Sequence, residues 1–468
     1  MGNNIIRMMR TVNNPKRISF LISALIRVIG TWGKKEDCQT PTSLLRRGSM
    51  LGLLVFIGLI TQGLIVPANA ANSQHLEQLR TTNSCPKCDL RDAQLTGANL
   101  QKADLSDANL EGANLEGANL SNAKLNRTQL QGAKLSGAIL AGANLRQAKL
   151  GARQQEKEKE TVPTNLQNAD LQGADLGSAD LTSAKLTGAN LREAKLNYAQ
   201  LSSANLEKAD LTRSQLGAAN LSGANLKQAQ LNIATLSGAN LTSAQLTGAN
   251  LQTISADNVN LSGADLRQAN LSEANLDHGN LKGALLQDGV LNAATLRNSD
   301  MSGSKLPGAI LKGADLSRAN LTRTNLENAD LTNAKLASTN LTEAQLTGAK
   351  LLSSYLFSAN LTKANLNGVN LRQALLRSAD LTNASLVGAT LENANLISTQ
   401  LTQANLTYTN LTQCDLTGAN LTNANLSNAN LTQANLELAT LANANLTGAN
   451  LSNAKIEDAI GLNPSALP

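Results

Sequence analysis

Residues 419–428 read Ala-Asn-Leu-Thr-Asn-Ala-Asn-Leu-Ser-Asn, and this pattern decides the fold. For almost all of the length from Cys88 to Asp458 a leucine returns every five residues, with a small residue two places before it. A helix turns about 100° per residue and a strand about 180°, so neither keeps residues spaced by five on one face. The leucines can all point inward only if the backbone turns a corner once per pentapeptide. The pattern therefore predicts a four-sided solenoid.

We call the leucine position i, so that the second inward position is i−2. Two large side chains on each side would overfill a narrow interior, and i−2 is accordingly small. Alanine dominates it, and the other small residues there are Thr128, Thr164, Ser214, Gly279, Gly289, Ser299, Ser304, Thr324, Thr339, Ser354, Thr399, Thr409 and Cys414. Leucine is replaced at i by Ala256, Met301 and Ile456. Ile254 stands at i−2 just before Ala256, so we expect a slight local distortion there. Frequent glycine at i+2, as in Gly97, suits a turn that needs positive φ.

The repeated A-(N/D)-L-x-x motif resembles the pentapeptide-repeat family, whose fold is a right-handed quadrilateral β-helix. The resemblance covers residues 88–152 and 164–458, which hold 65 and 295 residues, or 13 and 59 pentapeptides. It implies an all-β solenoid with four pentapeptides per coil. With layers spaced about 4.8 Å apart, the expected rod is on the order of 85 Å long. The family includes many members with no assigned activity, so the resemblance says little about function.

The charge is uneven along the chain. Residues 1–87 contain 11 Lys+Arg and 3 Asp+Glu, which leaves residues 88–468 with a net charge of −2 although the whole chain has +6. The repeat region therefore shows neither the basic stripe of a nucleic-acid-binding surface nor the acidic excess of a DNA mimic. We expect no nucleic-acid partner.

Residues 1–70 form an N-terminal extension with features of export. Arg46-Arg47 precede the apolar run Met50 to Val66, which is followed by an Ala-x-Ala sequence that ends at Ala70. This order is typical of a signal peptide cleaved after Ala70. An uncleaved membrane anchor, with membrane contact through Met50 to Val66, is the alternative.

Residues 71–87 are expected to cap the N-terminal end of the solenoid. A short amphipathic helix over 71–84 would place Leu76 and Leu79 over the end of the core, because an open end exposes apolar residues and unpaired strand edges. Cys85 and Cys88 follow. In an exported protein they could form a local disulfide; a redox or metal site is the other interpretation, although a zinc site usually needs four ligands.

Three further features complete the sequence prediction. The charged segment 153–163 interrupts the period as a loop insertion, either solvated or for partner docking. Tyr355 and Phe357 flank Leu356 and are the best candidates for a small apolar contact patch. After Asp458 the period fails, so residues 459–468 are expected to form a C-terminal cap, and the resemblance to family members that dimerise through this end makes a homodimer plausible.

The sequence argues against an enzyme. The two histidines lie far apart, and no nucleophile beside a base, phosphate-binding loop or metal-ligand cluster is present, so no cofactor is expected. The leading hypothesis is a structural or protein-interaction rod outside the cytoplasm, with an unknown protein partner. The alternatives are a membrane-tethered scaffold and, by resemblance to quinolone-resistance members, a topoisomerase-protecting DNA mimic. Resemblance to exported cyanobacterial members implies the periplasm or the thylakoid lumen.

Overall fold

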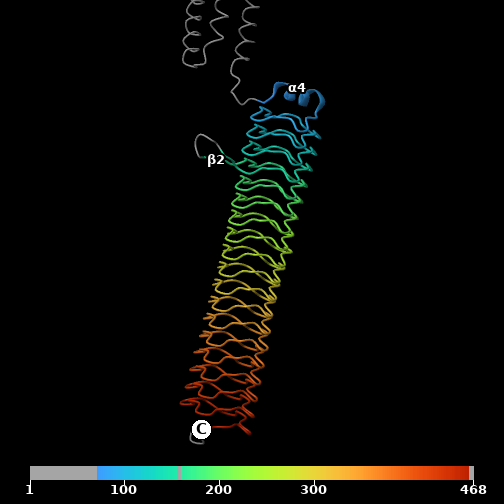
Figure 1. The fold of residues 1–468 in the computed structure, drawn as a ribbon. Helices are drawn as coiled ribbons and strands as arrows, with labels where there is room; N and C mark the ends of the chain where they lie inside the picture. The colour runs from blue at the N-terminus through green and yellow to red at the C-terminus, as the bar shows by residue number, and fades with distance from the viewer. Residues whose placement is uncertain (1–70, 155–159, 463–468) are drawn as a thin grey trace, which may run out of the picture. The chain divides into compact units, whose positions relative to one another are not determined.

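A computed structural model describes residues 71–154 and 160–462 as a stack of four-sided coils (Figure 1). Parallel bridges join residues twenty apart, such as Asn340 with Asn360, so four pentapeptides make one coil as predicted. Each side of a coil contributes a single bridged residue at i−1, followed at once by a turn. This geometry explains why the repeats form a ladder of isolated bridges instead of long strands.

Nearly every corner is a β-turn with the same backbone conformation. At Leu421 the carbonyl accepts the Ala424 N–H at 3.0 Å, and Asn423 between them has φ 57°. Position i+2 is left-handed at every corner from Lys87 to Asp458 except at Ala152, where the insertion begins, and a left-handed residue there is the requirement of a type II turn. Glycine occupies some of these positions, as predicted, but Asn, Ser, Gln and other residues occupy most of them. The stack therefore tolerates the cost of a Cβ in the left-handed region at many corners.

The polar residue at i−1 supports the corner that follows it. The Asn420 Oδ1 accepts the backbone N–H of Thr422 at 3.1 Å and the Thr422 hydroxyl at 2.6 Å. Such side-chain-to-backbone bonds are typical of Asn and Asp in turns. This contact gives a physical reason for the Asn-Leu-Thr and Asn-Leu-Ser sequences on the exterior.

Leucine and alanine fill one continuous core, and nearly all of them are at most 1% exposed. Buried threonines at i−2 are satisfied locally; the Thr324 hydroxyl donates to the Met301 carbonyl at 3.0 Å. Where Ile254 and Ala256 exchange large and small positions, the turn bonds of Ile254 and Val259 lengthen to 3.4 and 3.3 Å. The exchange therefore disturbs the turns slightly and leaves the stack intact.

A helix, α4, spans Ser73–Thr82 at the N-terminal end of the stack (Figure 1). The Asn72 side chain caps its first turn, and Asn83 ends it in the left-handed conformation. Leu79 is 2% exposed and Leu76 packs against the core. This helix lies within the segment 71–84 for which the sequence predicts one.

The coils extend beyond the predicted limits at both ends. Ser84 already bridges Asp104, and Ile460 bridges Thr440, because backbone pairing does not require a leucine in each repeat. The expected boundaries at 88 and 458 are therefore too narrow. Within the expected cap at 459–468, Ile460 occupies an outward i−1 position and is 63% exposed, so its side chain does not cover the core.

The insertion at 153–163 has an ordered base that the sequence did not predict. Strands β1 (Arg153–Gln154) and β2 (Thr161–Val162) pair antiparallel, and the coil register resumes with Lys134 bridged to Asn165. The Arg153 guanidinium contacts Asp92 at 2.8 Å and Glu111 at 3.3 Å. These ion pairs hold the base of the insertion against the side of the first coils.

The predictions for residues 1–70, including the signal peptide and the Met50 to Val66 anchor, lie outside the described residues, as do the insertion tip at 155–159 and residues 463–468. No helix in the described ranges is both long and apolar enough to cross a membrane.

Candidate functional site

Cys85 and Cys88 form a disulfide at the start of the stack, with their Cα atoms 5.4 Å apart. Cys85 occupies an inward leucine position, since its N–H donates to the Asp104 carbonyl as leucines do elsewhere. Cys88 is the next inward i−2 residue. Pro86 and Lys87 form the turn between them, and proline is favoured at this point of a type II turn. The disulfide therefore closes one corner beneath α4.

His75 ties α4 to the same corner. Its Nδ1 accepts the Asp89 backbone N–H at 3.0 Å, and the Cys85 sulfur lies 3.2 Å from the His75 carbonyl. These contacts belong to the packing of the cap. Among the described residues, no group of three or more His, Cys, Asp or Glu side chains could hold a metal ion. The remaining described cysteine, Cys414, is buried at i−2, and burial raises the pKa of its thiol to about 12.

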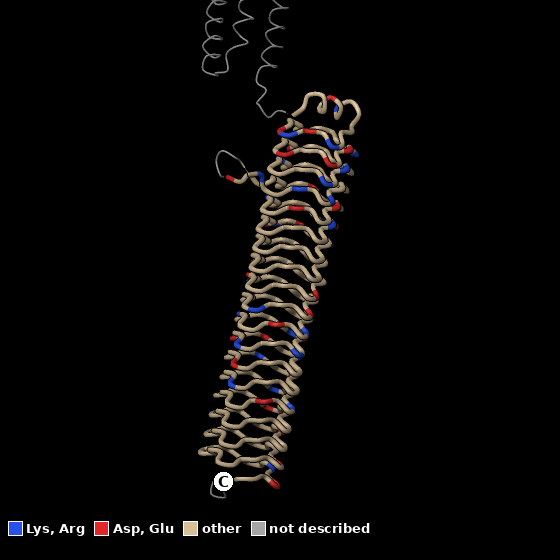
Figure 2. The backbone as a smooth tube through the Cα atoms, in the orientation of Figure 1, with Lys and Arg blue, Asp and Glu red and all other residues tan. Residues whose placement is uncertain are grey.

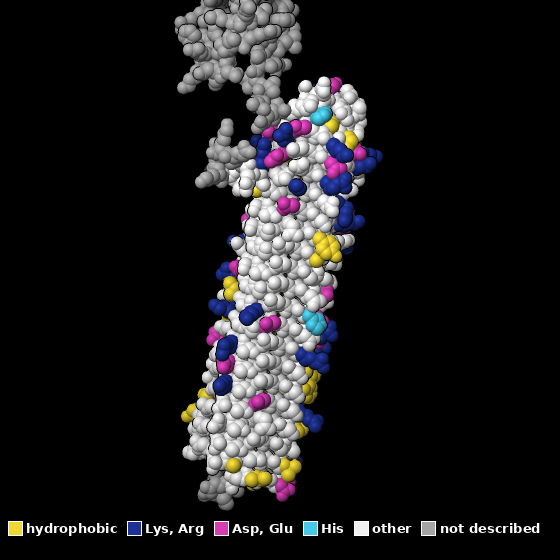
Figure 3. Space-filling model, in the orientation of Figure 1, with side chains coloured by type: hydrophobic (Ala, Val, Ile, Leu, Met, Phe, Trp, Pro, Cys, Tyr) yellow, Lys and Arg dark blue, Asp and Glu magenta, His cyan; other side chains and the backbone are white. Residues whose placement is uncertain are grey.

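The exterior is mostly polar and sparsely charged. Figure 2 shows few charged residues in the C-terminal coils, where only Asp415 and Glu437 are charged between residues 393 and 454. On the face drawn in Figure 3, apolar side chains form small groups among polar ones. A cluster of large apolar side chains is therefore a distinctive feature of this surface.

Tyr355 and Phe357 are such a cluster, as the sequence predicts for their exposure. They are 42% and 38% exposed, and their ring centroids lie 6.5 Å apart with the planes tilted by 45°. In the next coils Leu375 bridges Tyr355, and Ile397 follows on the same corner. We call Tyr355, Phe357, Leu375 and Ile397 the apolar patch; its last two members were not part of the sequence prediction.

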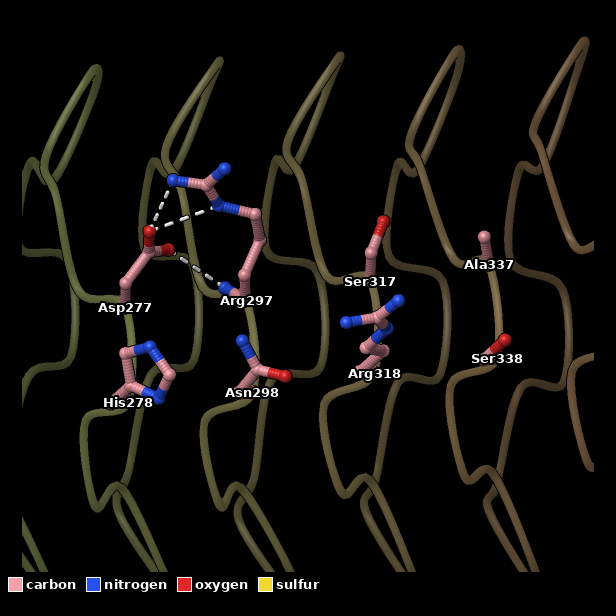
Figure 4. Close-up of a pocket in the computed structure, with 8 residues that line it drawn as sticks. All are labelled: Asp277, His278, Arg297, Asn298, Ser317, Arg318, Ala337 and Ser338. Carbon is pink, nitrogen blue, oxygen red and sulfur yellow. Dashed lines mark hydrogen bonds and ion pairs between the residues drawn. The ribbon is translucent and has the colours of Figure 1, made fainter.

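Beside the apolar patch the same corner is hollowed. The hollow is open, has a volume of about 490 Å³, and crosses successive coils (Figure 4). We call it the notch; its lining residues are Asp277, His278, Arg297, Asn298, Ser317, Arg318, Ala337 and Ser338. The Ser338 N–H donates to the Phe357 carbonyl at 2.8 Å, so the notch and the apolar patch occupy adjoining coils.

Arg297 and Asp277 make one wall of the notch rigid. Asp277 accepts the Arg297 Nε at 2.9 Å and the Arg297 backbone N–H at 2.9 Å (Figure 4). Asp277 is only 8% exposed. Partial burial opposes its ionisation, but the bonds from Arg297 outweigh burial and hold the pKa of Asp277 below its ordinary value. Asp277 thus neutralises and orients Arg297.

Unlike Arg297, Arg318 has no acidic partner: no carboxylate among the described residues lies within 4.0 Å of its guanidinium. Arg318 is exposed, as is His278. The sequence analysis did not single out Arg297 or Arg318. Arranging the sequence in rows of twenty would have aligned Asp277, Arg297, Ser317, Ala337 and Phe357 in one column.

Comparison with known families agrees with this geometry. A model described as pentapeptide repeats matches residues 88–150, 164–252 and 256–460 in overlapping segments, except for residues 352 and 353. The chain belongs to the pentapeptide-repeat family. The resemblance read from the A-(N/D)-L-x-x motif is therefore confirmed.

Other pentapeptide-repeat proteins of known structure are similar to this one. HetL, from the cyanobacterium Nostoc sp. strain PCC 7120 and involved in heterocyst differentiation regulation, is 37% identical over 46% of this chain and 89% of its own, with a TM-score of 0.22. A protein from the Arabidopsis thaliana thylakoid lumen is 30% identical over 23% of this chain and 70% of its own, with a TM-score of 0.17. The plasmid-mediated fluoroquinolone resistance protein QnrB1 is 19% identical over 47% and 90%, with a TM-score of 0.20, and shows the fold alone. No curated protein matches significantly.

Proposed function

We propose that this pentapeptide-repeat protein is a non-enzymatic rod that binds a protein partner outside the cytoplasm. The apolar patch carries the proposal: Tyr355 and Phe357 are exposed, Leu375 bridges Tyr355, and the surface around them is otherwise mostly polar. Ile397 stands on the same corner two coils from Phe357. Contiguous exposed apolar side chains on a rigid scaffold are typical of contact surfaces, and aromatic residues contribute most to binding there. The regulatory role described for HetL agrees with a protein partner.

Photo-crosslinking in cells tests this interaction. A photoreactive phenylalanine analogue at Tyr355 should form one discrete crosslinked product with another protein. Tyr198 is a matched control, because it is an exposed tyrosine on the same corner eight coils away. Absence of a crosslink from Tyr355, or the same products from both positions, would contradict a specific partner at the apolar patch.

The extracytoplasmic location is supported by the signal-like residues 46–70, by the Cys85–Cys88 pair, and by the thylakoid-lumen relative. Cell fractionation with mass spectrometry of the N-terminus tests it. A chain that starts at Ala71 in the soluble extracytoplasmic fraction is expected. An intact N-terminus in the membrane fraction would replace this proposal with the tethered scaffold, and a cytosolic chain would refute export and call for a gyrase protection assay.

A homodimer through the C-terminal coils is a further part of the proposal. Ile460 points outward in the last described coil and is 63% exposed. An exposed large apolar side chain favours contact with another apolar surface, and a second copy of the chain carries the same one. Analytical ultracentrifugation should show a dimer that Ile460→Lys converts to a monomer; a monomer in both proteins would exclude it.

A further inference from the structure

Three cations surround the apolar patch without an acidic partner. Arg318 borders the notch, Lys335 bridges Tyr355, and Arg377 follows Phe357 one coil later. All three are exposed, and none has a carboxylate oxygen within 4.0 Å in the described part of the chain. Asp315 bridges Lys335 in the preceding coil, so this surface holds four cations, Arg297 included, and the two carboxylates of Asp277 and Asp315. It is still locally basic, on a repeat region whose net charge is −2.

The floor of the notch allows close approach of another chain. Along the corner, Arg297 is followed by the small residues Ser317 and Ala337 and then by Phe357. These four residues stand in successive coils, so Arg297 and Phe357 are about 14 Å apart along the axis. The notch therefore holds the Arg297 guanidinium and the small side chains that follow it, and the aromatic ring of Phe357 stands in the next coil, just beyond the notch.

We propose that the notch and the apolar patch together bind an extended segment of a partner protein, with an acidic residue two to four positions from a large apolar residue. This inference rests on the proposed interaction function and adds the chemistry of the partner. The acidic side chain contacts Arg318, and the apolar side chain packs on Tyr355 and Phe357. A guanidinium suits this role because it binds a carboxylate in a bidentate manner.

The spacing in the segment follows from the coil spacing. Arg318 and Phe357 stand two coils apart, or about 10 Å along the axis, and an extended chain advances about 3.3 Å per residue. Three residues span that distance, and the long arginine side chain allows one more or one fewer. The preformed Asp277–Arg297 pair keeps the far wall of the notch in place without loss of side-chain freedom on binding.

The apolar patch favours a protein segment over an anionic polysaccharide. A polysaccharide has no aliphatic or aromatic side chain to bury against Leu375 and Ile397, which are aliphatic and half-buried. An aliphatic or aromatic side chain loses no hydrogen bond there and buries apolar surface.

Phage selection of random dodecapeptides against the full chain tests the inference. Selected peptides should share an acidic residue two to four positions from a large apolar residue. Arg318→Glu should weaken a selected peptide at least tenfold, and replacing the acidic residue of that peptide with lysine should restore binding to this variant. Phe357→Ser should weaken binding more than tenfold, because aromatic residues dominate such contacts.

Matched controls separate the notch from general surface effects. Lys363→Glu changes an exposed cation on another corner, and Tyr198→Ser removes an exposed tyrosine eight coils away; neither should change peptide binding more than twofold. The inference would be overturned if the selected peptides shared no sequence pattern. It would also be overturned if the unchanged peptide bound Arg318→Glu as tightly as the parent protein, or if only polygalacturonate, and no peptide, bound in a way that depends on Arg318. A specific crosslink from Tyr355 alongside any of these results would leave the proposed function standing, whereas loss of that crosslink would refute the function itself.

Discussion

Restoring the repeat pattern at Ile254 and Ala256 tests how strictly the core conserves volume. Ala256 lies in the leucine stack between Leu236 and Leu276, so that stack lacks one large side chain. Ile254, two residues earlier, is 3% exposed and fills much of the missing volume from i−2. The informative variants are Ile254→Ala, Ala256→Leu and the double substitution that recreates the Ala-x-Leu repeat.

The expected magnitudes follow from this packing. Ile254→Ala leaves a cavity beside Ala256 and should destabilise the coil by about 3 kcal/mol. Ala256→Leu inserts a large side chain against Ile254 and should destabilise it by about 2 kcal/mol. The double variant regains the packing of neighbouring coils and should lie within about 1 kcal/mol of the parent, so the coupling between the two sites is about 4 kcal/mol.

Hydrogen exchange measured by mass spectrometry reports the change in stability of individual coils. A local measurement is needed because a repeat array need not unfold in one step. Peptides covering residues 251–276 should exchange over a hundredfold faster in Ile254→Ala and near the parent rate in the double variant. Peptides covering residues 411–436 are the internal control and should not change. Additive effects in the double variant would refute the volume-exchange explanation.

Three further outcomes are expected. Asp277→Asn should lose about 1 kcal/mol of local stability at pH 7. Because the folded pKa of Asp277 is depressed, its contribution is present above the ordinary carboxyl pKa and disappears as the pH falls through the folded pKa. The difference in protection of residues 277–298 between the two proteins should therefore shrink as the pH falls below the ordinary carboxyl pKa, and a difference that does not shrink would contradict the ion pair. Cys414 should resist iodoacetamide at pH 8 in the native protein and react only after denaturation, since its thiol is buried and has a pKa of about 12; native labelling would show that the core opens. Cys85→Ser should increase exchange in residues 73–104 and leave residues 411–436 unchanged, whereas an unchanged N-terminal end would show that the disulfide adds no stability there.

Only part of the notch and the apolar patch could be predicted from the sequence. Tyr355 and Phe357 could be predicted as exposed, because their positions beside Leu356 follow directly from the period of five. Leu375 and Arg318 join them only through stacking; the four pentapeptides per coil that the resemblance implies put them in neighbouring rows of twenty, but no pattern within one repeat does. The extent of the coils was also misjudged, since Ser84 and Ile460 pair through backbone groups that no side-chain pattern reveals.

By itself, the sequence determined the solenoid, its leucine and alanine core, the outward polar positions and the place of the insertion, because each depends on the period of one short repeat. Only the tertiary structure decided which of the stacked outward residues touch. Stacking brings together residues twenty apart, so Asp277 meets Arg297 and the notch adjoins Phe357. The interior is specified locally by the size and polarity of each repeat, whereas a binding surface arises from contacts between coils.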